Sequence, residues 1–308
     1  MIRSGCIAVL LASACAAQPQ LAPVATPAAT IAFTEGPAVD AGGNVYFTDL
    51  TSRRIFKLPP KGPLSIFREN SNGANGLAID QRGRLIACEG GDPKAGIPPR
   101  LTRTDLATGE IEVLAQQFEG RPLGSPNDVT LDNQGRIYFT DQGRSPAVYR
   151  IDSTSRISRI LAAPDIERPN GIMISPDDRT LYLVESNQAE GGARMIRAYD
   201  LAADGSVHNM RVFHNFYPGR SADGLCIDTR GNLYAAAGLH RPRGTSENLD
   251  TRPGIHVFSP AGKLLSYIPI PEDTVTNCAF GGPDMRTLYV TAGKTLWRAP
   301  VEIPGTPR

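Results

Sequence analysis

The chain has no surplus of charge of either sign, which limits the partners that it could recognise. It contains 32 Lys and Arg against 31 Asp and Glu, for a net charge of +1. The basic residues are scattered among acidic ones and form no stripe, so nothing in the sequence supports nucleic-acid binding. Its 41% of hydrophobic residues is ordinary for a globular domain with a large core.

Helical periodicity is nearly absent after the first residues of the chain. Short strand-like runs alternate with turns about every ten residues, and apolar residues do not recur at helical spacing. The 31 Gly and 26 Pro fit many short strands joined by turns. These features predict an all-β domain.

Long apolar runs are also missing, except for one short run at the N-terminus. MIRSGCIAVLLASACAAQ has an early Arg followed by apolar and small residues, as a secretory signal peptide does, and is too short to span a membrane. LASAC (11–15) also resembles a bacterial lipobox with Cys15 as the lipid-bearing residue. We expect a signal peptide over residues 1–15, an Ala- and Pro-rich linker over 16–30, and export to the bacterial periplasm. The exported protein is either anchored by a lipid at Cys15 or free after ordinary cleavage.

Cysteine is scarce: beyond the leader the chain has Cys88, Cys226 and Cys278. Three is an odd number, which excludes a complete disulfide framework. No histidine signature accompanies any of them, so a catalytic cysteine is not expected. Cys226 and Cys278 lie in strands of similar sequence and are interpreted as buried thiols. A bridge between them in an oxidising compartment is the alternative.

One pattern recurs six times: a polar amide or acid, a short apolar strand, a Gly- or Asp-rich turn and a second strand. The copies are EGPAVDAGGNVYFTD from Glu35, NGLAIDQRGRLIACE from Asn75, NDVTLDNQGRIYFTD from Asn127, NGIMISPDDRTLYLVES from Asn170, DGLCIDTRGNLYAAA from Asp223 and NCAFGGPDMRTLYVT from Asn277. Their spacing of roughly 40 to 55 residues is typical of propellers. Further strand candidates between the copies, such as 54–59 and 100–106, complete four-stranded blades. The sequence therefore predicts a six-bladed β-propeller over residues 31–304.

The first residue of every copy carries a side-chain oxygen, and none carries a positive charge. If the first strand of each blade lines the central channel, six such side chains surround one axis: Glu35, Asn75, Asn127, Asn170, Asp223 and Asn277. Such a ring is costly to bury unpaired. Its hard oxygen ligands suit one divalent metal ion, Ca²⁺ first, with Mg²⁺, Mn²⁺ and Zn²⁺ as other candidates. Alternatively, these residues only cap strand ends at the mouth of the channel.

Several segments carry a family resemblance: EGPAVD (35–40), SPNDV (125–129), RPNGI (168–172), ADGLCID (222–228), RLIACEGG (84–91), GLHRPRGT (238–245) and TNCAFGGPD (276–284). They resemble the gluconolactonase family, which includes senescence marker protein (regucalcin) and related bacterial lactonases. The resemblance runs from about Ile31 to Pro300, nearly the whole chain after the leader. It implies a six-bladed propeller with a divalent metal, usually Ca²⁺, in the channel.

The resemblance also implies roles for individual residues. When the family's motifs are matched to this sequence position by position, the residues that hold the metal are Glu35, Asn127, Asn170 and Asp223. The same match places Asp128 close to the substrate. One departure is Ser125, because some sugar lactonases carry a substrate-gripping Arg at that position. This puts a gluconolactone-like substrate in doubt and leaves the metal chemistry intact.

Lactone hydrolysis needs a polarised carbonyl, a delivered water and a stabilised oxyanion, and a metal with an open position supplies the first and the last. Asp223 is expected to act as ligand and base, with Asp128 orienting water or substrate. Four further residues are expected to contact the substrate: Asn75, Asn277, His240 and Glu89.

Two other functions stay open at this point. A related propeller with the same metal shell could hydrolyse phosphotriesters, and a propeller without catalysis could bind a ligand or a partner. The two acids of the ring favour metal chemistry, since a scaffold does not need them. The expected partner is therefore a small-molecule lactone, with no nucleic acid, and the oligomeric state is left undecided.

Overall fold

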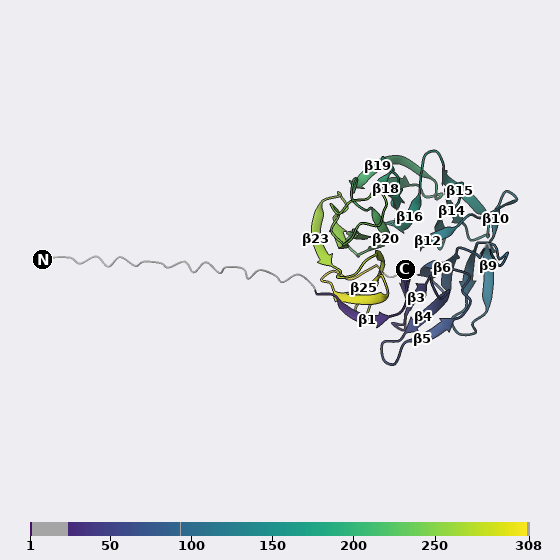
Figure 1. Cartoon of the computed structure of the whole chain (residues 1–308), viewed down its shortest axis with the longest axis horizontal. Coiled ribbons are helices and arrows are strands. Elements are labelled where there is room, and N and C mark those ends of the chain that lie inside the picture. The colour runs from purple at the N-terminus through teal and green to yellow at the C-terminus, as the bar shows by residue number, and fades with distance from the viewer. Residues whose placement is uncertain (2–23, 93, 307–308) are drawn as a thin grey trace.

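The computed structural model describes residues 1, 24–92 and 94–306. Within them every regular element is a β-strand, and six four-stranded antiparallel sheets surround a central axis (Figure 1). This confirms the predicted all-β, six-bladed propeller. The predicted signal peptide, including Cys15, lies outside the described residues apart from Met1. The described residues form no helix of the length and hydrophobicity that a membrane span requires.

Each blade is a meander whose first strand lies at the axis, except that the sixth takes its outermost strand from the N-terminus. Blade one consists of β2 (Thr34–Val39), β3 (Val45–Asp49), β4 (Arg54–Leu58) and β5 (Ser65–Arg68). Blade two consists of β6 (Ala74–Ile79), β7 (Leu85–Glu89), β8 (Arg100–Thr104) and β9 (Ile111–Ala115). Blade three consists of β12 (Pro126–Leu131), β13 (Ile137–Asp141), β14 (Ala147–Ile151) and β15 (Ile157–Ala162). Blade four consists of β16 (Pro169–Ile174), β17 (Thr180–Ser186), β18 (Arg194–Leu201) and β19 (Val207–Asn215). Blade five consists of β20 (Ala222–Ile227), β21 (Leu233–Ala237), β22 (Gly254–Phe258) and β23 (Leu264–Pro269). Blade six consists of β24 (Val275–Gly281), β25 (Thr287–Ala292), β26 (Thr295–Pro300) and β1 (Thr26–Thr30). A short hairpin, β10 (Gln117–Phe118) and β11 (Arg121–Pro122), lies outside the blades.

The ring closes through the two ends of the chain. Each of the inner strands β2, β6, β12, β16, β20 and β24 contacts the next, and β24 contacts β2. β1 pairs with β26, so the N-terminal strand completes a blade whose other strands are C-terminal. The predicted domain boundary at residue 31 was therefore too late, because Thr26–Thr30 belongs to the propeller. At the other end, Gly305 bridges to Asp228, beyond the predicted end at 304.

The recurring Asp of the repeats holds the turn between the first and second strands. Asp132, for example, accepts hydrogen bonds from the backbone N–H groups of Gln134 (3.0 Å) and Arg136 (2.9 Å). Gly135 in the same turn has φ +77°, a conformation that glycine adopts at little cost. This geometry explains why four of the six copies, those with Asp40, Asp80, Asp132 and Asp228, read Asp, two residues, Gly.

A second set of acids lies at the end of the second strand of blades one to four or one residue before it, on the opposite side of the disc. Its members are Asp49, Glu89, Asp141 and Glu185. The Asp141 carboxylate accepts from the backbone N–H groups of Gly124 (2.8 Å) and Ser125 (2.6 Å). The Glu185 carboxylate accepts from Arg168 N–H at 2.7 Å. The Asp49 carboxylate accepts from Phe33 N–H. Asp49, Asp141 and Glu185 therefore position the loops that lead into the inner strands, whereas Glu89 accepts from side chains on other strands.

Candidate active site at the channel mouth

A bulge in the inner strand of each blade places the predicted ring. The ladder between first and second strand shifts register in every blade close to the strand's second residue, for example between Glu35 and Ala38 and between Ala222 and Leu225. Bulges of this kind re-aim side chains and are frequent beside active sites. Five of the six predicted residues occupy this second position: Glu35, Asn75, Asn127, Asn170 and Asp223.

Asn277 does not share that position, which corrects the predicted register by one residue. The backbone N–H of Asn277 donates to Thr291 Oγ1 (3.1 Å), as that of Asp128 donates to Thr140 Oγ1 (3.0 Å). Asn277 is therefore the counterpart of Asp128. The sixth ring position is Thr276, whose hydroxyl donates to the Thr34 carbonyl at 2.9 Å and so serves the backbone.

Beneath the ring, Asp128 and Asn277 enter the channel, and glycines make room for them. The other four blades have glycine at this level: Gly36, Gly76, Gly171 and Gly224. A Cβ on Gly76 would lie under 3.0 Å from Asp128 Oδ1, and one on Gly224 under 3.0 Å from the Asn277 side chain. The amide of Asn277 donates a hydrogen bond to the Asp128 carboxylate.

Three carboxyl groups influence one another at this end of the channel. Burial raises the pKa of Glu35 well above its ordinary value, and the charges of Asp223 and Asp128 raise it further. Burial also raises the pKa of Asp128 to about 7, against hydrogen bonds from the backbone N–H groups of Val129 and Ile172. Three acids are thus held close together, away from water, where charge repulsion between them is strong.

Arg220 supplies a positive charge beside these acids, and sequence reasoning missed it. Its side chain is buried, donates to the Asp223 carboxylate and donates to the Val275 carbonyl at 2.9 Å. Burial raises the pKa of Asp223, while the Arg220 charge lowers it. A single Arg in a loop, three residues before Asp223, carries no pattern by which the sequence could have revealed it.

The amides of the ring lie among these charged groups. Asn170 donates from Nδ2 to Ser186 Oγ at 3.2 Å and also hydrogen-bonds to the Asp223 carboxylate. Asn75 and Asn127 are half-buried at the same level. Their side chains add carboxamide oxygens next to the carboxylates.

This donor set fits a hard divalent cation. Its candidate ligands, Glu35, Asn127, Asn170 and Asp223, offer only carboxylate and carboxamide oxygens, which Ca²⁺ and Mg²⁺ prefer. A cation there would offset the repulsion that raises the pKa of Glu35. Across the described residues, no three His, Cys, Asp or Glu side chains form a metal-binding group by themselves. The two amides would therefore be needed to complete the site.

The structure places two of the predicted substrate contacts outside the ring. Glu89 is fully buried and accepts from Arg100 Nε (2.6 Å), Thr102 Oγ1 (2.6 Å) and Arg68. Its carboxylate therefore joins β7 and β8 of blade two to β5 of blade one. His240 is exposed in the loop after β21, and its Nε2 lies 2.8 Å from the Ile270 carbonyl. That contact attaches the loop to the end of β23.

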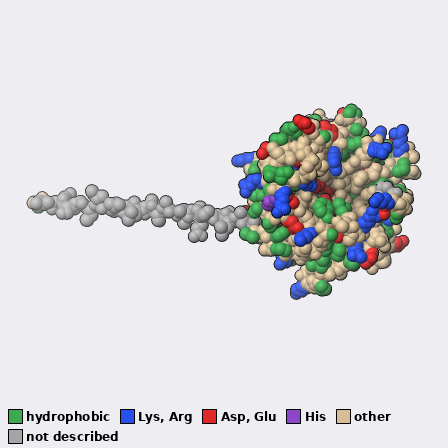
Figure 2. All heavy atoms as spheres, in the orientation of Figure 1, with side chains coloured by type: hydrophobic (Ala, Val, Ile, Leu, Met, Phe, Trp, Pro, Cys, Tyr) green, Lys and Arg blue, Asp and Glu red, His purple; other side chains and the backbone are tan. Residues whose placement is uncertain are grey.

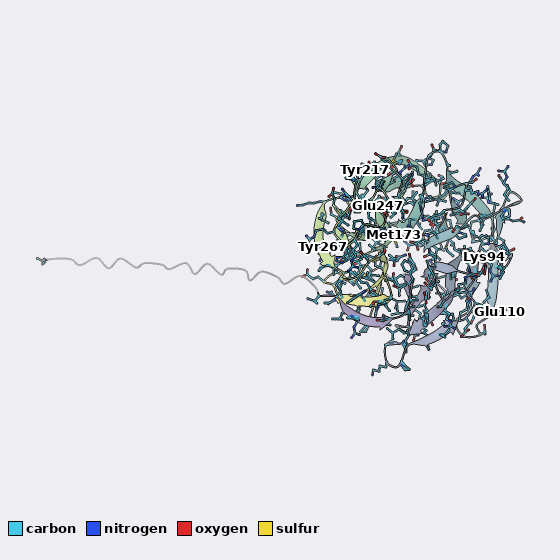
Figure 3. All side chains as sticks on the ribbon, viewed as in Figure 1. Lys94, Glu110, Met173, Tyr217, Glu247 and Tyr267 are labelled. Atoms are coloured by element: carbon cyan, nitrogen blue, oxygen red, sulfur yellow. The ribbon has the colours of Figure 1, made fainter. Side chains whose placement is uncertain are left out.

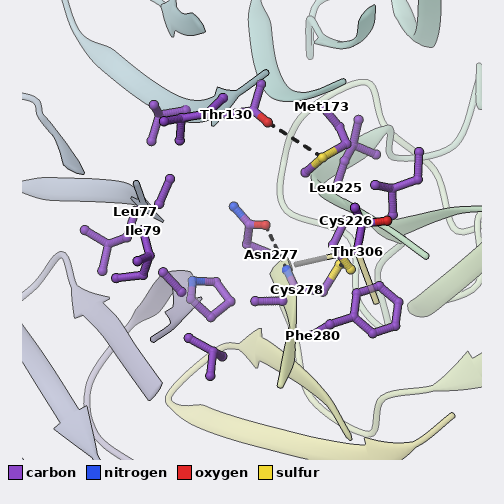
Figure 4. A pocket seen from close by; sticks show the side chains of 18 of the residues that line it. Leu77, Ile79, Thr130, Met173, Leu225, Cys226, Asn277, Cys278, Phe280 and Thr306 are labelled. Atoms are coloured by element: carbon purple, nitrogen blue, oxygen red, sulfur yellow. Dashed lines mark hydrogen bonds between the residues drawn. The ribbon is translucent and has the colours of Figure 1, made fainter. Parts of the chain in front are cut away.

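A cavity of about 450 Å³ lies on the other side of the Asp128–Asn277 pair (Figure 4). Its walls are the later, apolar residues of the inner strands, including Leu77, Leu225 and Phe280, and none of the five ring residues lines it. Met173, on its wall, lies near the centre of the disc, whereas Tyr267 and Glu110 lie at the rim (Figure 3). The channel is thus divided into an acidic mouth and an apolar cavity.

Figure 2 shows acidic side chains in a central depression of the disc, with Lys and Arg side chains on the surface around it. Negative charge is therefore concentrated in the centre of this face, and positive charge surrounds it.

Comparison with known proteins identifies relatives of this chain. Residues 33–294 match the profile of the SMP-30/Gluconolactonase/LRE-like region. The chain is 26% identical over 312 residues to the gluconolactonase of Zymomonas mobilis subsp. mobilis, covering 90% of this chain and 80% of that protein. It is 30% identical over 272 residues to regucalcin of Gallus gallus, covering 84% and 82%. The structure of a gluconolactonase from Xanthomonas campestris matches with a TM-score of 0.74 at 28% identity, over 92% of this chain and 96% of that one.

Proposed function

The chain belongs to the SMP-30/gluconolactonase/LRE-like family, and we propose that it is a metal-dependent lactonase that opens a small cyclic ester. The observation that carries the proposal is the group of carboxyls at the mouth of the channel, Glu35, Asp128 and Asp223. Burial raises the pKa of all three, and the charge of Asp223 raises the pKa of Glu35 and Asp128 further. A fold gains nothing in stability from such repulsion, so a function is the better explanation. The gluconolactonase names of its relatives support a lactone as the substrate.

Glu35, Asn127, Asn170 and Asp223 would hold the metal, with Ca²⁺ as the proposed ion. When bound, a divalent ion with an open position polarises the ester carbonyl and stabilises the negative charge that develops on its oxygen. The chain's own contribution is to orient these four side chains through the bulges of the inner strands. Arg220 adds to this by holding the Asp223 carboxylate in place.

The attacking water must lose a proton, and two carboxylates are placed to take part. Asp223 lies in the ring itself, at the second residue of β20, and we assign proton removal to it. Asp128 lies one residue deeper and receives hydrogen bonds from Val129 N–H (3.0 Å), Ile172 N–H and the Asn277 amide. These bonds fix its orientation, which suits a group that orients water or substrate.

The N-terminal sequence supports one further proposal, that the protein acts after export to the periplasm. Residues 2–23, which carry the signal-like segment and Cys15, are outside the described part of the chain. The proposal therefore rests on the sequence pattern alone. Mass spectrometry of the protein isolated from cells would detect a lipid at Cys15 or a free N-terminus after cleavage.

The proposed activity is tested by hydrolysis of glucono-1,5-lactone and a panel of other lactones, with Ca²⁺ and with EDTA. We expect the wild-type protein to hydrolyse a lactone and EDTA to abolish this turnover. We expect Asp223→Asn to lower the turnover by about a hundredfold or more. His240→Ala is the matched control, because that residue lies outside the ring, and it should stay within about threefold of wild type. Turnover that persists in Asp223→Asn would overturn the proposed role of the ring.

Two further outcomes separate the alternatives. A protein that binds Ca²⁺ but opens no lactone would then be assayed with phosphotriesters, which a site of this kind could also hydrolyse. A protein that neither binds a divalent ion nor hydrolyses either substrate would be a binding propeller. Isothermal titration with Ca²⁺ decides between these two outcomes without reference to any substrate.

A further inference from the structure

Two thiols from adjacent blades face each other at the wall of the apolar cavity. Cys226 lies in β20 of blade five and Cys278 in β24 of blade six, and their Sγ atoms are 2.9 Å apart (Figure 4). Sulfur atoms in a disulfide are about 2 Å apart. A movement of less than about 1 Å would therefore bring the two atoms to bonding distance.

The surroundings of the pair hold both side chains in this arrangement. Cys226 and Cys278 belong to one buried cluster with Tyr234 and Val275, and the Cys278 thiol contacts the Tyr234 carbonyl at 3.6 Å. Both residues are at most 5% exposed, yet both line the cavity, which is open to solvent at one end. A small reagent can reach them through the cavity, whereas another protein cannot.

We propose that Cys226 and Cys278 are a redox-active pair that closes to a disulfide between blades five and six. The oxidant is a small-molecule disulfide such as oxidised glutathione. The thiolate of one cysteine attacks it, forms a mixed disulfide and releases one glutathione thiol. The second cysteine then displaces the other glutathione. Two electrons and two protons leave the protein pair and appear in two glutathione thiols.

The bond would strengthen the closure of the ring. It joins positions that are 52 residues apart, so it restricts the unfolded chain considerably. It also ties blade six, which is completed by the N-terminal strand β1, to the blade before it. The inference is independent of the proposed lactonase activity, because neither cysteine belongs to the ring at the mouth.

Peptide mapping tests the bond directly. The full-length folded protein is equilibrated in glutathione buffers from fully reduced to fully oxidised, free thiols are trapped with N-ethylmaleimide, and the protein is digested with trypsin. Cleavage releases Cys226 in residues 221–230, Cys278 in 264–286 and Cys88 in 85–94, with one cysteine in each peptide. We expect a cross-linked 221–230/264–286 pair to appear in a single transition, with Cys88 still trapped as the maleimide adduct.

Variants supply the second measurement. The melting temperature should rise on oxidation in wild type and in Cys88→Ser, and should not change in Cys226→Ser or Cys278→Ser. Cys88 is a matched control because it is also buried in a strand of a blade. Full maleimide trapping of both cysteines in the most oxidising buffer would overturn the proposal, as would cross-links that involve Cys88 to the same extent. An equal melting temperature for oxidised and reduced wild type would refute the stabilising role of the bond. If a variant does not fold, the peptide mapping still tests the bond, because it uses the wild-type protein.

Discussion

The side chains of Asp128 and Asn277 approach the axis of the propeller from opposite blades, three and six, and the Asn277 amide donates a hydrogen bond to the Asp128 carboxylate. The pair separates the acidic ring at the mouth from the apolar cavity behind it. The bottom of the proposed active site is thus made by two residues that the fold places at equivalent positions of their blades.

The buried carboxyl of Asp128 should make stability depend on pH. Burial raises its pKa from 3.8 to about 7, so between these values the folded state holds a proton that the unfolded state has lost. The free energy of unfolding therefore falls as pH rises, by about 1.4 kcal/mol per pH unit from this group, or roughly 3 kcal/mol between pH 5 and 7 as an upper bound. In Asp128→Asn this contribution is absent.

Urea unfolding of both proteins in EDTA at several pH values would measure the difference. We expect the variant to gain stability relative to wild type as pH rises from 5 to 8. The difference between the two proteins reports Asp128 together with its coupling to Glu35, because the Asp128 charge also raises the pKa of Glu35. A difference between the two curves that is constant with pH would show that the Asp128 carboxyl is ionised in the folded protein across this range.

Gly76→Ala should damage the floor of the site. The added Cβ would lie under 3.0 Å from Asp128 Oδ1 and from the neighbouring backbone, so Asp128 must move or the strands must separate. We expect a loss of about 1 to 3 kcal/mol in the free energy of unfolding and a lower kcat. Gly90→Ala is the control, because its Cβ would meet nothing closer than 3.5 Å. Equal stability of the two variants would argue against close packing at Gly76.

The five ring residues could be predicted because the repeats place them. Their positions relative to the strand and its turn recur in the sequence, and a propeller converts a recurring position into a ring. The alignment of Asn277 with these residues was wrong by one position. In its copy the residue before the asparagine is a threonine, whereas the Asn127 and Asn170 copies have a proline there. A sequence comparison by residue type favours the asparagine, whereas the backbone register places Thr276 in the ring.

Arg220 and Glu89 show what the repeats could not reveal. Arg220 lies in a loop with no counterpart in the pattern, and only the packing around Asp223 places its charge beside the ring. Glu89 belongs to an acid position shared by blades one to four. Its partner Arg100 lies on the neighbouring strand β8 of its own blade, whereas Arg68 lies on β5 of blade one. The pairing of Glu89 with Arg100 depends on strand register and its pairing with Arg68 depends on how adjacent blades pack, and the sequence states neither.

Removal of a divalent ion should lower thermal stability through the ring. An ion at about 100 times its Kd stabilises the folded state by about 2.7 kcal/mol, which raises the melting temperature by roughly 5 °C or more. We expect Ca²⁺ to produce this rise in wild type but not in Glu35→Gln. In EDTA the variant should be at least as stable as wild type, because a neutral side chain avoids the repulsion with Asp223 and Asp128. Glu110→Gln, on the exposed rim (Figure 3), should respond to Ca²⁺ as wild type does.

Substitution of Glu89 separates a structural acid from a substrate contact. Glu89→Gln leaves Arg68 and Arg100 without their carboxylate partner in a buried position, so we expect a loss of about 3 to 5 kcal/mol in the free energy of unfolding. The folded fraction should keep kcat/KM within about threefold of wild type, because the carboxylate lies outside the ring. The matched control is Glu112→Gln, which removes the partner of Arg103 from an exposed pair and should cost less than about 1 kcal/mol. Urea unfolding and lactone kinetics on the same preparations decide the question. A large loss of kcat/KM with unchanged stability would return Glu89 to the substrate site. The pattern predicted above would assign it to the contact between blades one and two.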